Sequence, residues 1–222
     1  MFKHLIGQSP DCENPVTLRL DEVIKASKRL DEQQQNNSSS SSTYSIPPAG
    51  FVFHESRCGS TLVANSLVAV SPSQHRVYSE SAPLIYAMKL TSDDPSPAGI
   101  EFMQNIVYLM GRTTNTNTNS ENSETKLFYK IQSIGTTHAR GLLRAFPEIP
   151  WIFVYRDPVQ VMMSHMPKDV DQAVCLRSRR HPPQGLVQLV KERSARDFRS
   201  LSSFESCAAH LVRRVLFFNL CI

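Results

Sequence analysis

Short apolar runs alternate with helical patterns along most of the chain. The runs are rich in apolar and β-branched residues and predict strands at 51–54, 76–79, 127–131 and 151–155. Between the runs, apolar residues recur at helical spacing and predict helices over 61–70, 83–90, 99–110, 137–146 and 158–166. Strands that alternate with helices predict an α/β fold with a parallel sheet. The uniformly apolar run 151–155 predicts a strand covered on both faces.

The first part of the chain has a different composition. Residues 16–30 show a short amphipathic helical pattern, whereas Gln33–Ser42 are almost wholly Gln, Asn and Ser. Such a segment cannot bury a core, so we predict a disordered linker there. The sequence therefore predicts two parts: 1–45, with the N-terminal helix and the linker, and 46–222, with the α/β domain. A second polar insert, 113–125, is predicted to be a surface loop.

Composition and charge fit one folded domain. The chain has 222 residues, of which 41% are hydrophobic and 20% charged, as is ordinary for a soluble protein with a core. The surplus of basic residues falls in 151–222, which fits an anionic partner or, more commonly, a solvated helix face. No nucleic-acid partner is expected. The arginines of this surplus are Arg177, Arg179, Arg180, Arg193, Arg196, Arg199, Arg213 and Arg214.

The cysteine pattern and the hydropathy bear on the compartment. Five cysteines are scattered along the chain without a C-x-x-C pair, which argues against a disulfide framework or a zinc cluster and favours a reducing compartment. No metal site is expected. No apolar stretch reaches the ~18 residues of a membrane span, and residues 1–15 lack the apolar core of a signal peptide. We therefore expect no transmembrane segment, with a cytoplasmic location favoured.

A polar, cationic corner, residues 55–61, joins the first predicted strand to its helix. Gly59 lets the backbone approach an anion closely, and Ser60 and Thr61 offer hydroxyls at the helix start. Arg57 adds a fork-shaped cation. The alternative is a plain strand-to-helix turn with Ser60 or Thr61 as the N-cap. The Walker A pattern is absent, which weakens an ATPase or GTPase hypothesis.

A second corner, residues 156–164, follows the predicted strand at 151–155. Arg156 leaves the strand, Asp157 and Pro158 are suited to the N-cap and first position of a helix, and Ser164 lies eight residues after Arg156. This segment resembles the nucleotide 3′-phosphate site of the sulfotransferase family, in which a strand ends in Arg-[Asp/Asn]-Pro and a Ser follows eight residues after that Arg.

The first corner resembles the 5′-phosphosulfate loop of the same family, which has the form Pro-[Arg/Lys]-Ser-Gly-[Ser/Thr]-Thr. Arg57 and Gly59–Thr61 match that pattern, whereas Ser56 replaces the usual Pro and Cys58 the usual Ser. Both motifs occur in the family's order, and the resemblance spans about residues 50–167.

The resemblance implies a three-layer α/β/α fold with a parallel sheet, like that of P-loop nucleotide kinases. It implies the co-substrate 3′-phosphoadenosine 5′-phosphosulfate, no metal, and transfer of a sulfuryl group to a hydroxyl or amine of a small-molecule, carbohydrate or protein acceptor. The donor's 5′-phosphosulfate suits the first corner, including Cys58, and its 3′-phosphate suits Arg156 and Ser164. Arg57 is then the first cation near the leaving phosphate, and Lys130 is a candidate second.

The resemblance leaves the general base open. In cytosolic members, a Lys on the strand that corresponds to 127–131 is followed two residues later by a catalytic His, but this chain has Gln132 there, which cannot act as a base. Glu80 is the best substitute, because tyrosylprotein-type members carry a Glu base in a similar place; the alternative is a helix-capping carboxylate before Pro83. Lys130 could equally be a solvated lysine at a strand end. Weaker candidates for the base are His54, Glu55 and His138.

The end of the chain departs from the family pattern. Members continue beyond the second corner with another strand and a late basic segment, but no fifth strand is predicted after Met166, where 186–222 is mostly helical by pattern. We expect an uncovered sheet edge, and the apolar stretch Leu211–Ile222 either to fold back as a helix or to cause aggregation. A truncated, non-catalytic nucleotide-binding or interaction module is therefore an alternative function. A P-loop kinase is a further alternative, against which the missing Walker lysine counts.

Overall fold

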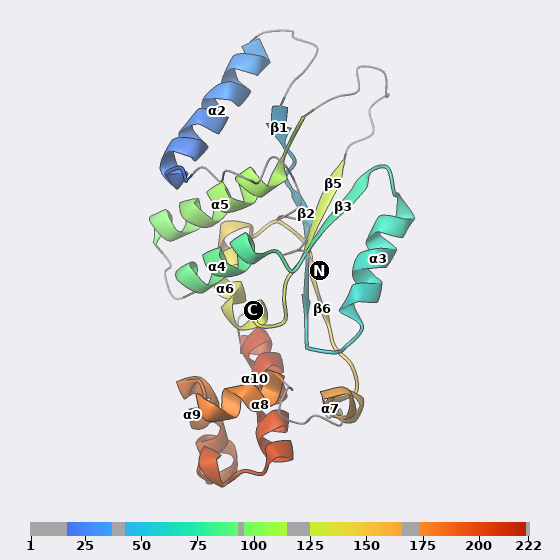
Figure 1. Cartoon of the computed structure of the whole chain (residues 1–222), viewed down its shortest axis with the longest axis vertical. Coiled ribbons are helices and arrows are strands. Elements are labelled where there is room, and N and C mark those ends of the chain that lie inside the picture. The colour runs from blue at the N-terminus through green and yellow to red at the C-terminus, as the bar shows by residue number, and fades with distance from the viewer. Residues whose placement is uncertain (1–16, 37–42, 93–95, 115–124, 166–173, 221–222) are drawn as a thin grey trace. The chain divides into compact units, whose positions relative to one another are not determined.

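A computed structural model describes residues 17–36, 43–92, 96–114, 125–165 and 174–220 (Figure 1). The chain divides into two compact units. One unit comprises 1–44 with 113–118, and the other comprises 45–112 with 119–222. The second unit holds the sheet and both predicted corners.

A four-stranded parallel sheet forms the centre of the larger unit. Its strands are β2 (Pro48–His54), β3 (His75–Ser79), β5 (Lys126–Lys130) and β6 (Trp151–Val154), in the order β3-β5-β2-β6. Every pair in this sheet is parallel. All four strands lie where the apolar runs predict them, and the prediction of an α/β fold with a parallel sheet is confirmed.

The register of the sheet brings the strand ends together. Lys130 at the end of β5 pairs with Val52 on one side and with Ser79 on the other, and His54 pairs with Val154. Because the strands are parallel, the chain leaves each of them at the same edge. The first corner, Glu80 and the second corner all begin at that edge.

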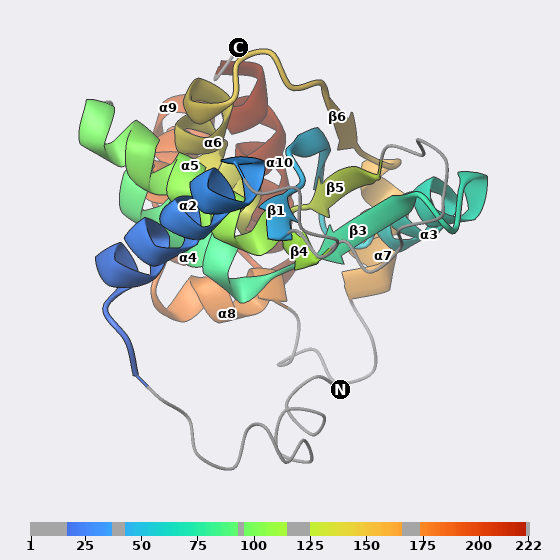
Figure 2. The ribbon, with the colours of Figure 1, turned by 90° about the horizontal axis from the view of Figure 1, so that it is seen from above.

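Helices cover the two faces of the sheet unequally. On one face lies α3 (Ser60–Val70); on the other lie α4 (Ala82–Thr91), α5 (Pro97–Gly111) and α6 (Ala139–Ala145), as both ribbon views show (Figures 1 and 2). This division follows from right-handed crossovers, since the chain moves from β2 to β3 in one direction and from β3 to β5 and β6 in the other. A short 3₁₀ turn, η2 (Gly135–His138), precedes α6.

The main core lies on the face that carries α4, α5 and α6. Phe51 and Phe53 of β2 pack there with Tyr129 of β5, and their rings make tilted contacts with one another and with Phe146. Fully buried aromatic side chains contribute roughly 1.5–3 kcal/mol each by leaving water. The central strand is therefore anchored from this face. The helical residues of this core include Leu84, Met88, Met103, Val107 and Leu142.

Strand β6 lies at the edge of the sheet, and its α3 face is only partly covered. Ile152 remains 49% exposed, so the prediction that this strand is covered on both faces is wrong. An apolar run alone does not distinguish a central strand from an edge strand whose one face packs on the core. Within the described residues, no strand pairs with the outer side of β6, as the sequence predicts.

The smaller unit differs in part from the prediction. Its helix, α2 (Leu20–Asn36), starts four residues after the predicted helix and continues through Gln33–Asn36, which was predicted to be linker. The reason is that Gln is a good helix former, although a polar segment of this kind cannot bury a core. Residues 37–42 of the predicted linker lie outside the described residues. Strand β1 (Thr43–Ser45) pairs with β4 (Arg112–Thr114), where the second polar insert begins.

Helices follow the sheet. The second corner leads into α7 (Pro158–His165), and α8 (Val174–Arg180), α9 (Gln184–Ser194) and α10 (Ser203–Leu220) come after it. The prediction that the chain end folds back as a helix is confirmed up to Leu220, whereas α8 was not predicted. None of the helices in the described part of the chain is both long and apolar enough to span a membrane.

Arginines of the basic surplus connect these helices. Arg179 donates hydrogen bonds to the Ser203 hydroxyl, at 2.9 Å, and to the Leu201 carbonyl, at 2.6 Å. Arg196 pairs with Glu205 at 2.6 Å between Nη1 and Oε1. At these two positions the basic residues hold helix ends together.

A disulfide between Cys175 of α8 and Cys207 of α10 corrects the sequence-based expectation. Both cysteines are buried and pack against Met162 of α7 and Leu176. They are 32 residues apart in the chain, so that neither spacing nor number shows that they meet. This pair weakens the argument for a reducing compartment that rested on the scattered cysteines.

Replacing both Cys175 and Cys207 by Ala should lower the free energy of unfolding by about 3–4 kcal/mol, because the crosslink closes a loop of this length in the unfolded chain. Chemical denaturation of oxidised protein measures the loss. The matched control is Cys58→Ala, which removes a free cysteine and should leave the crosslink intact. Alkylation of both Cys175 and Cys207 in native, unreduced protein would contradict the pairing.

Replacing Gly141 by Ala should cost about 1–3 kcal/mol of unfolding free energy, because α6 packs closely on α4 at this residue. A Cβ there would lie 2.5 Å from Thr91 Oγ1 and 2.8 Å from the Thr91 carbonyl oxygen, and backbone cannot yield cheaply. Gly185→Ala is the control, since its Cβ would come no closer than 3.6 Å, to Arg213. Equal thermal stability of the two variants would contradict the close packing.

Candidate functional site

The first corner has the backbone of a strained loop. It begins after His54 and ends at Gly59, the N-cap residue of α3, whose φ is 92°. Arg57 also has a positive φ, 62°, which costs about 1–2 kcal/mol for a residue with a Cβ. Strain of this kind is concentrated at ligand-binding and catalytic loops.

The start of α3 lacks a capping side chain. Gly59 carries no side chain to accept hydrogen bonds from the first turn, and Ser60 is already inside the helix and buried. The alternative interpretation of Ser60 or Thr61 as the N-cap is therefore wrong. Amide groups at an uncapped helix start favour an anion. The residues predicted to bind an anion therefore lie at a helix start whose backbone amides are suited to an anion.

The second corner has the predicted helix cap. The Asp157 carboxylate accepts a hydrogen bond from the Gln160 amide at 3.0 Å, which confirms Asp157 as the N-cap of α7. Arg156 is exposed and donates to the Gln160 side-chain oxygen at 2.6 Å. The Ser164 hydroxyl donates to the Val161 carbonyl at 2.8 Å. Arg156 therefore contacts a neutral amide and keeps its charge for a ligand.

The side chain of Arg57 links the two corners. Arg57 of the first corner donates from Nε and Nη2 to the backbone carbonyl of Ser164, at 3.4 and 3.3 Å. The two residues are 107 positions apart in the sequence. The structure thus brings together Arg57 and Ser164, which were predicted to bind opposite ends of one ligand.

Glu80 and Lys130 meet at the same edge of the sheet. The Lys130 ammonium contacts Glu80 Oε1 directly, and the Glu80 amide donates to the Lys130 carbonyl at 2.8 Å. The Lys130 side chain is 2% exposed, so the alternative of a solvated strand-end lysine is wrong. The capping alternative for Glu80 also fails, since the N-cap of α4 is Ser81. Glu80 has a positive φ of 57° and is 38% exposed.

His54 completes this group, although the sequence ranked it as a weak candidate. Its Nδ1 lies 2.7 Å from the Glu55 carbonyl oxygen, and its Nε2 lies 3.7 Å from Glu80 Oε1. The second distance exceeds a hydrogen bond, so those two groups interact through charge. The sequence feature that could have indicated this role is the position of His54, which is the last residue of an apolar strand directly before the first corner.

The surroundings of His54 and Glu80 alter the ionisation of these two side chains. Burial alone would lower the pKa of His54, but Cys58, Glu80 and the Glu55 carbonyl favour the charged ring and raise its pKa to about 9, against Lys130. The pKa of Glu80 falls to about 2, mainly because of His54 and also because of Lys130, while burial opposes the change. At neutral pH the group therefore holds two cations around one carboxylate.

The geometry excludes a cysteine–histidine–carboxylate triad, although Cys58 lies close enough to act on the His54 ring. In such a triad the carboxylate and the thiol use opposite ring nitrogens. Here Nδ1 is used by the Glu55 carbonyl, and the carboxylate of Glu80 faces Nε2.

The remaining weak candidates have structural contacts. The Glu55 amide donates to the Val154 carbonyl at 3.0 Å, and its side chain is buried. His138 Nδ1 lies 3.0 Å from the Ser92 hydroxyl, in the turn before α6. Among the described residues, no group of three His, Cys, Asp or Glu side chains is arranged to hold a metal ion.

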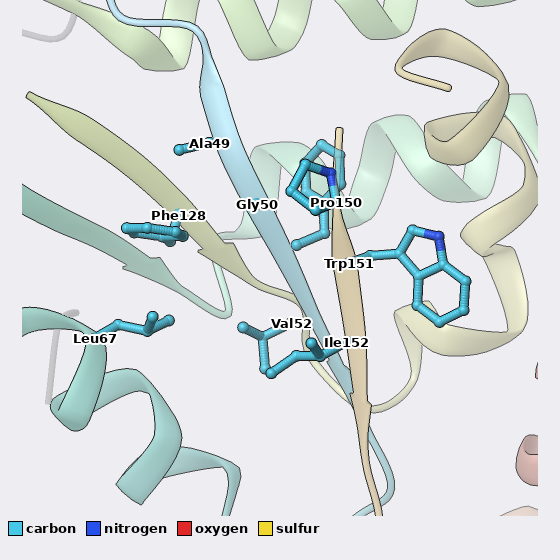
Figure 3. Close-up of a pocket in the computed structure, with 9 residues that line it drawn as sticks. Ala49, Gly50, Val52, Leu67, Phe128, Pro150, Trp151 and Ile152 are labelled. Carbon is cyan, nitrogen blue, oxygen red and sulfur yellow. The ribbon is translucent and has the colours of Figure 1, made fainter. Parts of the chain in front are cut away.

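A separate apolar hollow of about 140 Å³ lies on the α3 face of the sheet (Figure 3). Leu67 of α3, Val52 of β2 and Ile152 of β6 line it, together with Gly50 and Phe128. It lies toward the amino ends of β2 and β6, whereas both corners follow the carboxyl ends of these strands. Its apolar lining does not suit an anionic ligand.

The chain matches no protein-family model, no curated protein and no solved structure. The features of this chain that bear on its function are therefore the residues and geometry of the two corners and of the Lys130–Glu80–His54 group.

Proposed function

We propose that this protein binds 3′-phosphoadenosine 5′-phosphosulfate across the two corners and transfers its sulfuryl group to a hydroxyl or amine. The observation that carries the proposal is the contact of Arg57 with the Ser164 carbonyl, which places the two corners beside each other. A ligand that engages both motifs needs anionic groups at two separate places, as this donor has.

The strand order supports the proposal. The first corner follows β2, which lies between β5 and β6, and the second corner follows the adjacent β6. Ligands of open α/β sheets bind at the carboxyl edge, where crossovers leave in opposite directions from neighbouring strands. In this sheet β2 and β5 are such neighbours, because β2 leads to β3 and β5 leads to β6, and the first corner lies at that point.

The charges support the same assignment. Arg57 and Arg156 are exposed at the two corners, and charge-assisted hydrogen bonds to phosphate are about twice as strong as neutral ones. In the proposed complex, Arg57 and the first turn of α3 bind the phosphosulfate. Arg156 and Ser164 bind the 3′-phosphate.

Glu80 is the proposed general base. It is the accessible member of the Lys130–Glu80–His54 group and lies at the same sheet edge as the first corner. Lys130 was predicted to approach the leaving phosphate, but in this structure it contacts Glu80. Its contribution to the proposed reaction is therefore to hold the base in place.

Binding without transfer is the second candidate function. The observation in its favour is the lowered pKa of Glu80, about 2, because a carboxylate held by two cations is a weak base. The two functions differ in turnover and agree in nucleotide binding.

Adenosine 3′,5′-bisphosphate should bind more tightly than adenosine 5′-phosphate, because the bisphosphate engages both corners. Arg156→Ala should weaken binding of the bisphosphate about tenfold or more, as expected for a lost charge-assisted contact of about 1.5–3 kcal/mol. The same variant should bind the monophosphate almost unchanged. Titration calorimetry measures all four affinities.

Arg57→Ala and Arg140→Ala complete that experiment. Arg57→Ala should weaken both nucleotides, since both carry the 5′-phosphate, and exposed Arg140 of α6 serves as the control for loss of positive charge. Equal affinity of the unmodified protein for the two nucleotides would refute the two-corner site.

Glu80→Gln should lower the rate of sulfuryl transfer by about 10²–10⁴-fold, because the amide cannot accept the acceptor's proton. Its oxygen can still accept a hydrogen bond from Lys130, and the loss of one negative charge should not weaken binding of the anionic donor. Steady-state kinetics together with calorimetry separate the two effects. Unchanged turnover in Glu80→Gln would exclude Glu80 as the base.

A further inference from the structure

Two buried side chains converge on one oxygen of Glu80. Lys130 Nζ contacts Oε1, and His54 Nε2 lies 3.7 Å from the same atom. The side chains of Lys130 and His54 are 2% and 6% exposed, whereas that of Glu80 is 38% exposed. An acceptor can therefore reach Glu80 while the other two remain behind it.

The orientation of the His54 ring follows from its other contact. The Glu55 carbonyl can only accept, so Nδ1 carries a hydrogen and donates to it at 2.7 Å. Nε2 is buried, makes no hydrogen bond, and is directed at the Glu80 carboxylate. A buried ring nitrogen without a hydrogen bond is costly unless it carries a proton toward a nearby charge.

We propose that His54 is a positioning residue for Glu80: its ring and the Lys130 ammonium together hold Oε1, so that Oε2 faces the acceptor. This inference rests on the proposed sulfuryl transfer. In that step the acceptor's O–H or N–H proton passes to Glu80, and the new bond from the acceptor to sulfur forms. The sulfur–oxygen bond to the 5′-phosphate breaks, its electron pair stays on the leaving nucleotide, and Glu80 later releases the proton to solvent.

The arrangement gives the base a defined pH dependence. A cationic His54 lowers the proton affinity of Glu80, and a neutral one raises it. The groups that act on His54 come from three places: Glu80 after β3, Lys130 at the end of β5, and Cys58 with the Glu55 carbonyl in the first corner. Of these, Lys130 opposes the charge on His54, and the others favour it.

Replacing His54 should raise the pKa of Glu80 and make it a stronger base, which a simple loss of function would not do. His54→Gln removes the cation that contributes most to the lowered pKa of Glu80, so the carboxyl should titrate closer to its ordinary value of 4.5. The acid limb of the pH profile of kcat should move up by about one pH unit or more.

The test combines ¹³C nuclear magnetic resonance of the Glu80 side-chain carboxyl with the pH profile of sulfuryl transfer. The control is His138→Gln, which removes a half-buried histidine outside the group. In folded His54→Gln the Glu80 midpoint should rise by about one pH unit or more, and in the control it should not move. Circular dichroism checks that each variant is folded.

A measurement on the unmodified protein covers the case in which His54→Gln does not fold. The Glu80 carboxyl signal should show a second inflection where His54 loses its proton, near pH 9. Absence of that inflection, or an unchanged Glu80 midpoint in folded His54→Gln, overturns the inference even if transfer occurs. Absence of transfer in the unmodified protein, with the Glu80 shift present, instead overturns the proposed reaction and leaves His54 as a residue that positions a binding carboxylate.

Discussion

Parallel pairing around β2 is the constraint on which the candidate site depends. Because β3, β5, β2 and β6 all run in the same direction, the chain leaves every strand at one edge. Packing of Phe51 and Phe53 in the aromatic core also fixes the orientation of β2, because it determines which residues of that strand face α3. A shift of one residue in the register would turn His54 and Lys130 to the opposite face. The two corners and the charged group at the edge are thus consequences of the same hydrogen-bonding pattern.

Burial of Lys130 adds a second constraint. An ammonium group that is 2% exposed needs an anionic partner, and Glu80 provides it from the neighbouring strand. To reach that position the chain adopts a positive φ at Glu80, directly after β3. The ion pair with Lys130 therefore offsets the backbone strain at Glu80. Strained residues of this kind are typical of functional sites.

The sequence predicts the elements of this fold better than their contacts. Strand positions, the Asp157 cap and the two corners follow from local patterns, because apolar runs and turn residues act within a few positions. The contacts between Arg57 and Ser164 and between Cys175 and Cys207 join distant segments, and no local pattern encodes them. His54 was ranked low for the same reason, since its role depends on Glu80 and Lys130 from two other strands. The partial cover of β6 depends on what packs against the sheet, which an apolar run does not specify.

The charge arrangement resolves a conflict that the proposed reaction contains. The proposed general base is a carboxylate, yet it must lie close to a donor that carries several negative charges. An isolated Glu80 would repel that donor. Lys130 on one side and a protonated His54 on the other make the local charge of the three-residue group positive, and Arg57 adds to it at the first corner. The weak basicity of Glu80 is then a consequence of placing a carboxylate next to an anionic substrate. During transfer, negative charge develops on the leaving nucleotide and is stabilised by Arg57. This stabilisation favours movement of the acceptor's proton to Glu80 in the same step.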